Sequence, residues 1–158
     1  MTPQEIHDKL KAKFGDVVLE AKLDAHQPWI RLAPNKTKSV AFFLRDEPSL
    51  QFDYMMCLSG VDHSDGNLGV VYHLYSMAHK HKIVLKANCT KDNPNVQSVS
   101  EVWGTANWHE REVYDMFGIV FDEHPDLRRI LCPDDYPGFP LRKDFKVPEF
   151  YNGMKVPY

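Results

Sequence analysis

The chain has 158 residues, of which 43% are hydrophobic, and this length suits one compact domain with a modest core. Its formal net charge of -3 at pH 7 lacks the basic excess of nucleic-acid-binding domains, so no nucleic-acid partner is expected. Its three cysteines, Cys57, Cys89 and Cys132, contain no Cys-x-x-Cys pair, which argues against a disulfide framework and an iron–sulfur cluster.

The N-terminal residues carry a complete helix-start pattern. Thr2 suits the N-cap, Pro3 the first helical position, and Glu5 the third position of a capping box. The spacing predicts a helix over residues 3–14, and Gly15 suits its end. Apolar side chains four residues apart give this helix one stripe for burial. The stripe consists of Ile6, Leu10 and Phe14.

The following segments are shorter. Residues 17–19 and 29–32 are predicted as strands. The apolar run 40–44 suits either a buried strand or the inner turns of a helix, and we favour the helix. No uninterrupted apolar stretch is longer than this run of five residues, which is far shorter than the roughly 20 residues of a membrane helix. Ser49 suits the N-cap of a second short helix that we expect to end near Gly60.

Two β-rich runs at residues 69–77 and 82–89 predict an antiparallel hairpin, because a short polar segment separates them. In the second run, the side chains alternate between two faces. One face carries Ile83, Leu85, Ala87 and Cys89, and the other carries Lys82, Lys86 and Asn88. One side of the sheet is therefore expected to be covered by helices and the other to be at least partly wet, which predicts an α+β fold with a mixed or antiparallel sheet.

Two consecutive capping-box patterns precede the most unusual stretch of the chain. They pair Ser98 with Glu101 and Asn107 with Glu110, and they predict two short helices or one helix with a break near Gly104. The second helix is expected to end at Gly118, because glycine is favoured in the left-handed position after a helix.

Residues 121–158 show no helical or alternating period. Six of the eleven prolines lie between Pro125 and Pro157, so the segment is expected to be extended. Fixing a residue's backbone costs roughly 1–2 kcal/mol, yet this segment keeps the apolar anchors that disordered tails lack. We therefore expect an α+β domain over 1–120 and a tail over 121–158 that wraps a partner, with packing on its own domain as the alternative. The anchors are Phe121, Leu127, Ile130, Leu131, Tyr136, Phe139, Leu141, Phe145, Phe150, Tyr151 and Tyr158.

The charged residues of the second helix predict a network rather than an acid–base pair. Glu110 and Glu112 point about 200° apart on a helix, so they do not form a carboxylate dyad. Arg111 and Asp115 are four residues apart and suit a helical ion pair. Glu112 and Asp115 share a face, so a cation from the tail is expected between them. The alternative is a solvated helix face with scattered charges. The candidate cations are Arg128 and Arg129.

Other chemistry has little support. His109-Glu110 begins like a zinc motif, but the second histidine of His-Glu-x-x-His is absent, and no phosphate-binding glycine motif occurs in the chain. The serines lack a nucleophile elbow. These patterns predict an interaction module that holds no cofactor and no metal. An autonomous hydrolase or metalloenzyme using His79, His81 and Glu110 is the alternative from another functional class.

A long ordered motif in this chain resembles the C subunit, or thirty-kilodalton subunit, of respiratory NADH:quinone oxidoreductase (complex I). The motif is nearly gapless from Trp108 to Phe145, and softer similarity extends over 50–151. Its residues are Glu110-Arg111-Glu112, Tyr114-Asp115-Met116-Phe117-Gly118-Ile119, Phe121, His124-Pro125-Asp126-Leu127, Arg129-Ile130-Leu131, Gly138, and Pro140-Leu141-Arg142-Lys143-Asp144-Phe145. Tyr136-Pro137 stands where relatives more often carry a tryptophan before the glycine. The chain ends soon after the motif, which the resemblance identifies as the short form that is not fused to the D subunit.

The resemblance implies a cofactor-free scaffold in the peripheral arm of a proton-translocating complex that transfers electrons from NADH to quinone. Its tail would lie across the D subunit, which helps to form the quinone pocket, beside the B subunit and near the I subunit. FMN, iron–sulfur clusters and quinone are expected in those partner proteins. The implied location is the cytoplasmic side of the bacterial inner membrane, or the matrix side in an organelle, with membrane contact only through the assembled complex.

The same resemblance assigns no catalytic residue to this chain and implies interface or tail-anchoring roles instead. Arginine suits such roles because its planar group pairs with carboxylates at buried contacts. A membrane-bound hydrogenase or ferredoxin-coupled complex contains a similar subunit and is the alternative assembly. The implied residues are Glu110, Arg111, Glu112, Asp115, His124, Arg128, Arg129, Arg142, Lys143 and Phe145.

Overall fold

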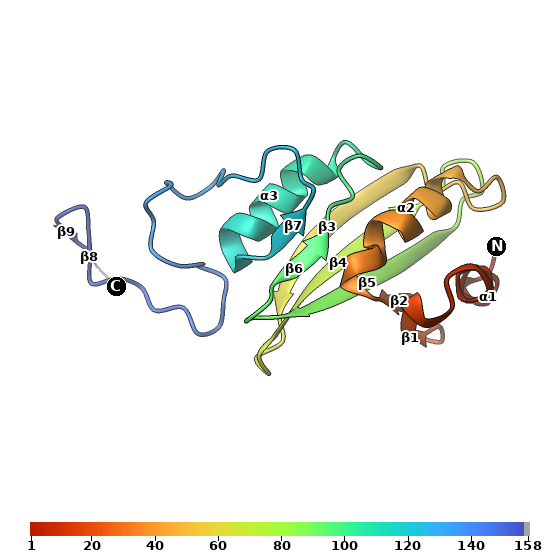
Figure 1. Ribbon diagram of the computed structural model, residues 1–158, viewed down its shortest axis with the longest axis horizontal. Helices are drawn as coiled ribbons and strands as arrows, with labels where there is room; N and C mark the ends of the chain where they lie inside the picture. The colour runs from red at the N-terminus through yellow and green to blue at the C-terminus, as the bar shows by residue number, and fades with distance from the viewer. Residues whose placement is uncertain (157–158) are drawn as a thin grey trace.

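A five-stranded mixed sheet forms the centre of the computed structural model, which describes residues 1–156 (Figure 1). Neighbouring strands are antiparallel except for β2 and β5, which are parallel. The mixed sheet and its helices confirm the predicted α+β class. In spatial order, the strands are β1 (Val18–Lys22), β2 (Trp29–Leu32), β5 (Lys82–Thr90), β4 (Asn67–Tyr75) and β3 (Tyr54–Asp62).

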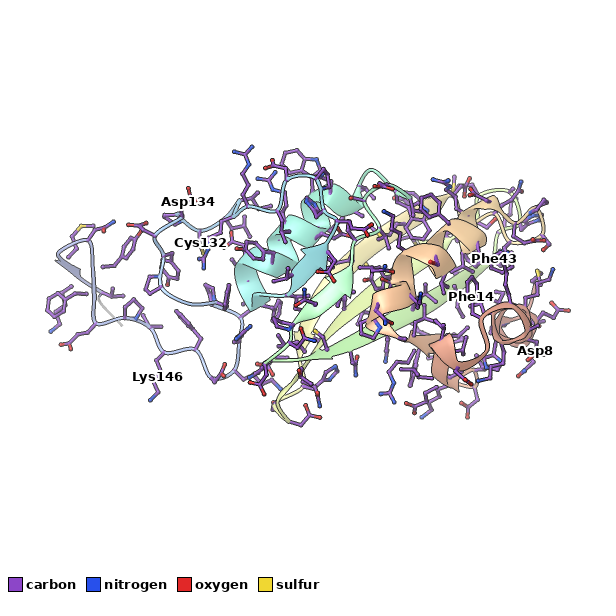
Figure 2. The ribbon with its side chains drawn as sticks, viewed as in Figure 1. Asp8, Phe14, Phe43, Cys132, Asp134 and Lys146 are labelled. Carbon is purple, nitrogen blue, oxygen red and sulfur yellow. The ribbon has the colours of Figure 1, made fainter. Side chains whose placement is uncertain are left out.

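The first helix, α1 (Pro3–Phe14), forms as the sequence predicts. The Thr2 hydroxyl accepts from the Glu5 N–H, and the Glu5 carboxylate accepts from the Thr2 N–H, which completes the capping box. The run 40–44 lies in α2 (Thr37–Asp46), so the preferred helical interpretation is confirmed. The two helices meet through the rings of Phe14 and Phe43, whose centroids are 5.6 Å apart (Figure 2).

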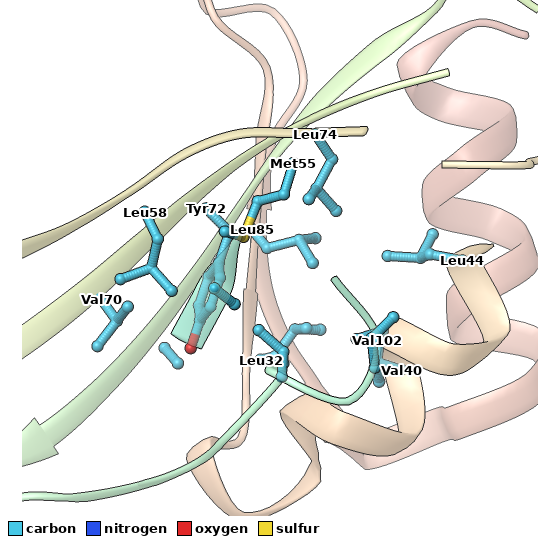
Figure 3. Packing of buried hydrophobic residues seen from close by; sticks show 14 of the residues in the cluster. Leu32, Val40, Leu44, Met55, Leu58, Val70, Tyr72, Leu74, Leu85 and Val102 are labelled. Atoms are coloured by element: carbon cyan, nitrogen blue, oxygen red, sulfur yellow. The ribbon is translucent and has the colours of Figure 1, made fainter. Parts of the chain in front are cut away.

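The hydrophobic core lies between one face of the sheet and the helices. Leu85 of β5 points toward Leu44 of α2, and Tyr72 of β4, which is paired with Leu85, lies on the same face of the sheet (Figure 3). The opposite face of the sheet carries half-buried side chains such as His73 and Lys86. Helices therefore cover one face of the sheet, as the alternation in the second hairpin strand predicts.

The predicted hairpin is confirmed as β4 and β5, which pair antiparallel from Asn67↔Thr90 to Tyr75↔Lys82. The predicted helix over 49–60 is wrong, because most of that segment forms the edge strand β3. A bulge between Met55 and Cys57 shifts the alternation, so the buried residues Met55 and Leu58 are three apart. The bulge thus imitates the spacing of a helix.

The predicted helix at 98–104 is also wrong. After the short strand β6 (Asn95–Gln97), the chain makes turns until α3 (Ala106–Phe117) begins. The N-cap Thr105 makes no side-chain cap, and Ser98 binds a carboxylate of α3 instead of capping a helix. The end of α3 at Gly118 is confirmed, with a φ of 70° in the left-handed region. The chain then forms β7 (Val120–Asp122), which is parallel to β6.

Beyond β7 the chain has little regular structure. It leaves the domain as a wide loop through Cys132, Asp134 and Lys146 (Figure 2) and reaches a small hairpin of β8 (Phe150–Tyr151) and β9 (Met154–Lys155). The predicted anchor Tyr158 lies outside the described residues. Across residues 1–156, every helix is too short or too polar to cross a bilayer.

Candidate functional site

The tail is attached to α3 by the carboxylate of Asp115, which is fully buried. Its Oδ2 accepts the consecutive backbone N–H groups of residues 130, 131 and 132 at 3.0, 2.7 and 2.9 Å. Its Oδ1 lies 3.5 Å from Nη1 of Arg129. Burial alone would raise the pKa of Asp115, but the three N–H groups and the Arg129 guanidinium together hold that pKa below its ordinary value. The ionised side chain thus fixes the path of the tail.

The C-terminal end of α3 is closed by side chains and backbone of the tail. Nε of Arg142 donates to the carbonyl of Phe117 at 2.6 Å, and the Leu141 N–H donates to the carbonyl of Met116 at 3.1 Å. These carbonyls have no partners within the helix, and a cation is favoured there by the helix dipole. The guanidinium of Arg142 also lies 4.6 Å from the ring centroid of Phe139.

Gly118 allows this close approach. A Cβ on Gly118 would stand 2.5 Å from the Phe139 ring and 2.8 Å from Nη2 of Arg142. Phe139 therefore occupies the space that a side chain at the helix end would take. Arg129 approaches the same ring from 5.4 Å and donates through Nη2 to the Gly138 carbonyl at 2.9 Å.

The carboxylate of Glu110 lies in the interior on the other side of the same helix. Its oxygens accept from the Ser98 hydroxyl at 2.6 Å and from the Val99 N–H at 2.7 Å. Burial raises the pKa of Glu110 to about 7, although both hydrogen bonds act to lower it. Nε2 of His124 lies 3.9 Å from the carboxylate, and both side chains are fully buried.

His124 is held in one orientation by backbone groups. Nδ1 accepts from the Asp126 N–H at 3.0 Å, so Nε2 carries the proton and donates to the Asn107 carbonyl at 3.1 Å. The start of the tail is thus fixed against the first turn of α3. Each polar atom of this imidazole has a structural partner.

A second attachment joins the tail to the sheet. Asp62, at the end of β3, accepts the Lys143 N–H at 3.0 Å and the Ser64 N–H at 2.9 Å. The Lys91 ammonium lies 3.0 Å from Asp62 and 3.1 Å from Asp144. The backbone hydrogen bonds from Lys143 and Ser64, followed by the Lys91 side chain, keep the pKa of Asp62 well below its usual range.

The remaining predicted site residues have separate environments. Arg111 does not pair with Asp115 as the helical spacing predicted: its Nε donates to the Arg128 carbonyl at 3.2 Å, and its guanidinium lies over the Trp108 ring. The Arg128 side chain is exposed and pairs with Asp126. The predicted cation between Glu112 and Asp115 is Arg129. Of these two carboxylates it pairs only with Asp115, because Glu112 is exposed. Arg111, Asp115 and Arg129 thus belong to a tail-anchoring network around α3, whereas the side chains of Glu112 and Arg128 do not link the tail to the helix.

The tail anchors divide into packed and exposed groups. Phe121 is 2% exposed, and Leu127 packs against the core. Tyr136 lies between the rings of Phe145 and Tyr151, at centroid distances of 6.2 and 5.5 Å. The exposed anchors are Leu131, Leu141 and Phe150, and the tail exposes two further apolar residues that were not predicted as anchors, Val147 and Met154. Packing on the chain's own domain therefore accounts for part of the tail's apolar side chains, and more than half of the surface of each exposed one is open to solvent.

The three residues of the metalloenzyme alternative have separate partners. His79 and His81 lie at the turn between β4 and β5, where their Nε2 atoms bond to the carbonyls of Pro48 and Leu50. Glu110 is held by Ser98 and Val99. Within residues 1–156, no three His, Cys, Asp or Glu side chains are arranged to hold a metal ion.

Sequence reasoning missed Asp62, Ser98 and Lys91 as members of the anchoring network. Ser98 carried a misleading local signal, because its spacing to Glu101 imitates a capping box. Asp62 and Lys143 are 81 residues apart, so no periodicity within one element connects them.

The sequence of this chain matches a described protein family and is similar to named relatives. Residues 30–151 match the family model described as the 30 Kd subunit of respiratory-chain NADH dehydrogenase. The C subunit of NADH-quinone oxidoreductase from Chloroherpeton thalassium is 54% identical over 94% of this chain, which spans 63% of that relative. The C subunit from Chlorobium phaeobacteroides is 50% identical over 96% of this chain and 93% of the relative.

Two solved structures have a similar fold. A trypsin-resistant fragment of Nqo5 is 27% identical, with a TM-score of 0.64, and the match covers 80% of this chain and the whole fragment. A chain in the structure of the membrane-bound sulfane sulfur reductase, an archaeal respiratory membrane complex, has a TM-score of 0.72. That match covers 90% of this chain and 85% of the archaeal chain at 23% identity, and it shows a shared fold.

Proposed function

The chain belongs to the 30 kDa subunit family of respiratory-chain NADH dehydrogenase, and from this membership we propose that it is a non-catalytic subunit of a proton-translocating NADH:quinone oxidoreductase. In this role it is a scaffold of the peripheral arm. It binds no FMN, iron–sulfur cluster or quinone itself and holds together the subunits that do. Electron transfer from NADH to quinone is the activity of the whole complex.

This proposal depends on which groups the two buried carboxylates of the motif bind. Asp115 is occupied by three backbone N–H groups of the tail, and Glu110 by Ser98 and Val99. A catalytic acid or base must reach a substrate proton, whereas these oxygens bind the chain itself. The motif thus favours fixing the path of the tail over performing chemistry.

The exposed apolar side chains of the tail supply the contact surface in this proposal. Leu131 is 62% exposed, Phe150 59% and Met154 67%, and all three lie on a segment that extends away from the domain. Apolar groups gathered on such a segment favour burial against another protein. The ordered network from His124 to Lys143 then serves as the base from which the tail reaches its partner.

The family resemblance suggests the identity of the partners. We infer that the tail lies across the D subunit, with the B and I subunits as further neighbours, on the cytoplasmic side of the inner membrane or the matrix side in an organelle. The fold is shared with a chain of an archaeal membrane-bound sulfane sulfur reductase, so the fold alone does not select the NADH-linked complex over the alternative hydrogenase or ferredoxin-coupled assembly. Relatives named as C subunits of NADH-quinone oxidoreductase, at 54% and 50% identity, favour the NADH-linked complex.

The test is affinity capture of tagged copies from gently solubilised native membranes, followed by mass spectrometry of the captured chains and an absorption spectrum. A full-length copy is expected to bring a multi-subunit set with flavin and iron–sulfur absorbance. A copy truncated after Lys146 is expected to recover about tenfold less of that absorbance, because it lacks Phe150 and Met154. A Leu19→Ser copy is the matched control, since Leu19 is 57% exposed on β1.

Truncation after Lys146 is a sharper variant than truncation after Ile130. A copy truncated after Ile130 would also lose the N–H donors of Leu131 and Cys132 to Asp115 and of Lys143 to Asp62. A loss of capture by that copy could then result from impaired folding as well as from impaired docking. A lone colourless band from the full-length copy would contradict membership of a respiratory complex. Full recovery by the copy truncated after Lys146 would contradict docking through the end of the tail.

A further inference from the structure

The sheet face opposite the helices contains a cavity of about 320 Å³. Its walls come from three strands and from the segment before β2. Cys57 of β3, His73 of β4 and Val84 of β5 stand side by side in register on its floor. Gln27 and Met56 lie at the side, and Lys82 provides a cation. This cavity contains none of the residues of the tail-anchoring network.

Cys57 and His73 form a polar pair inside the cavity. Sγ of Cys57 lies 3.3 Å from Nδ1 of His73, and Nε2 of His73 lies 3.4 Å from Oε1 of Gln27. Because the amide oxygen of Gln27 accepts, Nε2 carries the ring proton and Nδ1 presents its lone pair to the thiol. Burial, followed by the charge of Lys86, lowers the pKa of His73, so its imidazole is neutral at pH 7 and the Nδ1 lone pair facing the thiol is unprotonated.

The other two thiols have environments that disfavour reaction. Cys89 is 7% exposed, and burial raises its pKa to about 11. Burial also raises the pKa of Cys132, and the Asp115 carboxylate acts in the same direction. A thiolate is the reactive form of cysteine, so both residues are poor nucleophiles. Cys57 alone among the three has an imidazole acceptor and an open cavity beside it.

Lysines make the surroundings of the cavity attractive to anions. Lys82 lines the cavity and is exposed. Lys86 lies further along β5, and its ammonium stands 4.1 Å from the Trp29 ring centroid. Two cations beside a largely apolar hollow attract a small molecule that carries carboxylates.

The geometry points to Cys57 as a modification site that exchanges with small, carboxylate-bearing disulfides of the glutathione class. The thiol proton of Cys57 moves to Nδ1 of His73, and the thiolate attacks one sulfur of the small disulfide. A new S–S bond forms to Cys57, the disulfide's own S–S bond breaks, and its second sulfur leaves as a thiolate. Cys57 is oxidised to a mixed disulfide, and one half of the small disulfide is reduced.

This site is independent of the proposed scaffold role, because it uses a different face of the sheet. The test treats the purified full chain and, in parallel, solubilised native membranes with oxidised glutathione, and locates the adduct by peptide mass spectrometry. Cys57 is expected to carry the adduct before Cys89 and Cys132 in both samples. The Cys57→Ser variant is expected to lack this early adduct. Earlier reaction at either other cysteine, or modification confined to the isolated chain, would overturn the proposal.

Two variants separate the roles of the imidazole and the charge. His73→Gln is expected to slow modification of Cys57 about tenfold, since the proton acceptor is lost. Lys82→Gln is expected to slow the reaction with oxidised glutathione about threefold and to leave the rate with neutral 2-hydroxyethyl disulfide unchanged. Circular dichroism checks the fold of each variant. If His73→Gln does not fold, the proposal is still tested by the exposed Lys82 variant and by the order in which the three cysteines of the wild type are modified. If the Lys82 variant reacts with each of the two reagents at the same rate as the wild type, the anion preference is contradicted.

Discussion

The backbone N–H of Lys143 donates to Oδ2 of Asp62 at 3.0 Å, which joins the tail to the end of β3 across 81 positions of the sequence. The same carboxylate lies beside Lys91, which also approaches Asp144. The tail is therefore held on the sheet by Asp62 as well as on α3, where Asp115 and the carbonyls of Met116 and Phe117 bind it. Loss of the Asp62 contact removes the attachment of the tail at Lys143.

Asp62→Asn is expected to loosen the tail around Lys143. The amide keeps an oxygen for one N–H but loses the charge that binds Lys91, and hydrogen bonds to charged groups contribute about 1.5–3 kcal/mol. Cleavage by trypsin after Lys143 and Lys146 should accelerate roughly tenfold, as measured by a time course of peptide release. Asp65→Asn is the matched control: Asp65 accepts an N–H in the neighbouring turn and does not contact the tail. Equal cleavage rates in the two variants would refute the attachment.

Asp115→Ala is expected to lower the free energy of unfolding by about 3 kcal/mol, because it leaves three N–H groups and the Arg129 guanidinium without their acceptor. The control is Asp126→Ala, which removes an exposed aspartate from a pair with Arg128 and should cost less than about 1 kcal/mol. Urea unfolding at pH 7 measures both. A cost for Asp115→Ala no larger than the control would show that the tail binds without this carboxylate.

Acid should weaken the same contact. The folded pKa of Asp115 lies below its ordinary value, so its contribution to stability is present above the unfolded pKa of about 3.9 and is lost as pH falls through the folded pKa. The wild-type chain should thus lose more stability than Asp115→Asn as the pH is lowered through this range. Parallel acid-unfolding curves would contradict this assignment.

Glu110 predicts the opposite pH dependence. Its pKa is raised from 4.5 to about 7, so between these values the unfolded carboxyl loses its proton while the folded one keeps it. Stability therefore falls as pH rises through this window, by about 3 kcal/mol at most. Glu110→Gln should remove this slope, as urea midpoints measured at several pH values across the window would show.

The control for Glu110 is Glu112→Gln, which changes an exposed carboxylate further along the same helix. This variant should follow the wild-type slope. If Glu110→Gln instead keeps the full wild-type slope, other groups must titrate in this window and the buried carboxyl is already ionised at its lower end.

Gly118→Ala should destabilise the chain more than Gly66→Ala. Both glycines have positive φ, 70° and 87°, so the backbone strain of about 1 kcal/mol is common to both. Only at Gly118 would the new methyl group meet Phe139 and Arg142, whereas nothing lies within 4 Å at Gly66. We expect an extra cost of about 1–3 kcal/mol for Gly118→Ala. Equal unfolding free energies would show that Phe139 moves away without loss.

Local patterns predicted the elements whose partners are near in sequence. The capping box of Thr2 and Glu5, the helix end at Gly118 and the hairpin of β4 and β5 depend on residues close together in the chain. The prediction for segment 49–60 was wrong because the bulge in β3 gives a spacing that only pairing with β4 explains. Tertiary pairing there outweighs the local period.

The candidate site was predictable as a set of residues but not as a set of contacts. Sequence reasoning placed a tail arginine beside Asp115, and the structure assigns Arg129 to that position. It did not predict that the main partners of Asp115 are backbone N–H groups, because every residue except proline carries one and no residue type signals their direction. The network of Asp62, Lys91 and Lys143 joins distant segments and left no local pattern.

The parallel pairing of β6 with β7 has a consequence for the order of folding. It places Val96 opposite Phe121, so the segment between β6 and β7, which contains α3, begins and ends at neighbouring positions. All five strands of the main sheet precede this segment in the sequence, since β5 ends at Thr90. Closing a loop of this modest length is entropically cheap once the sheet exists. We therefore expect the sheet to form first during synthesis and α3 to close afterwards as one unit, which makes Asp115 available to the tail at the last step.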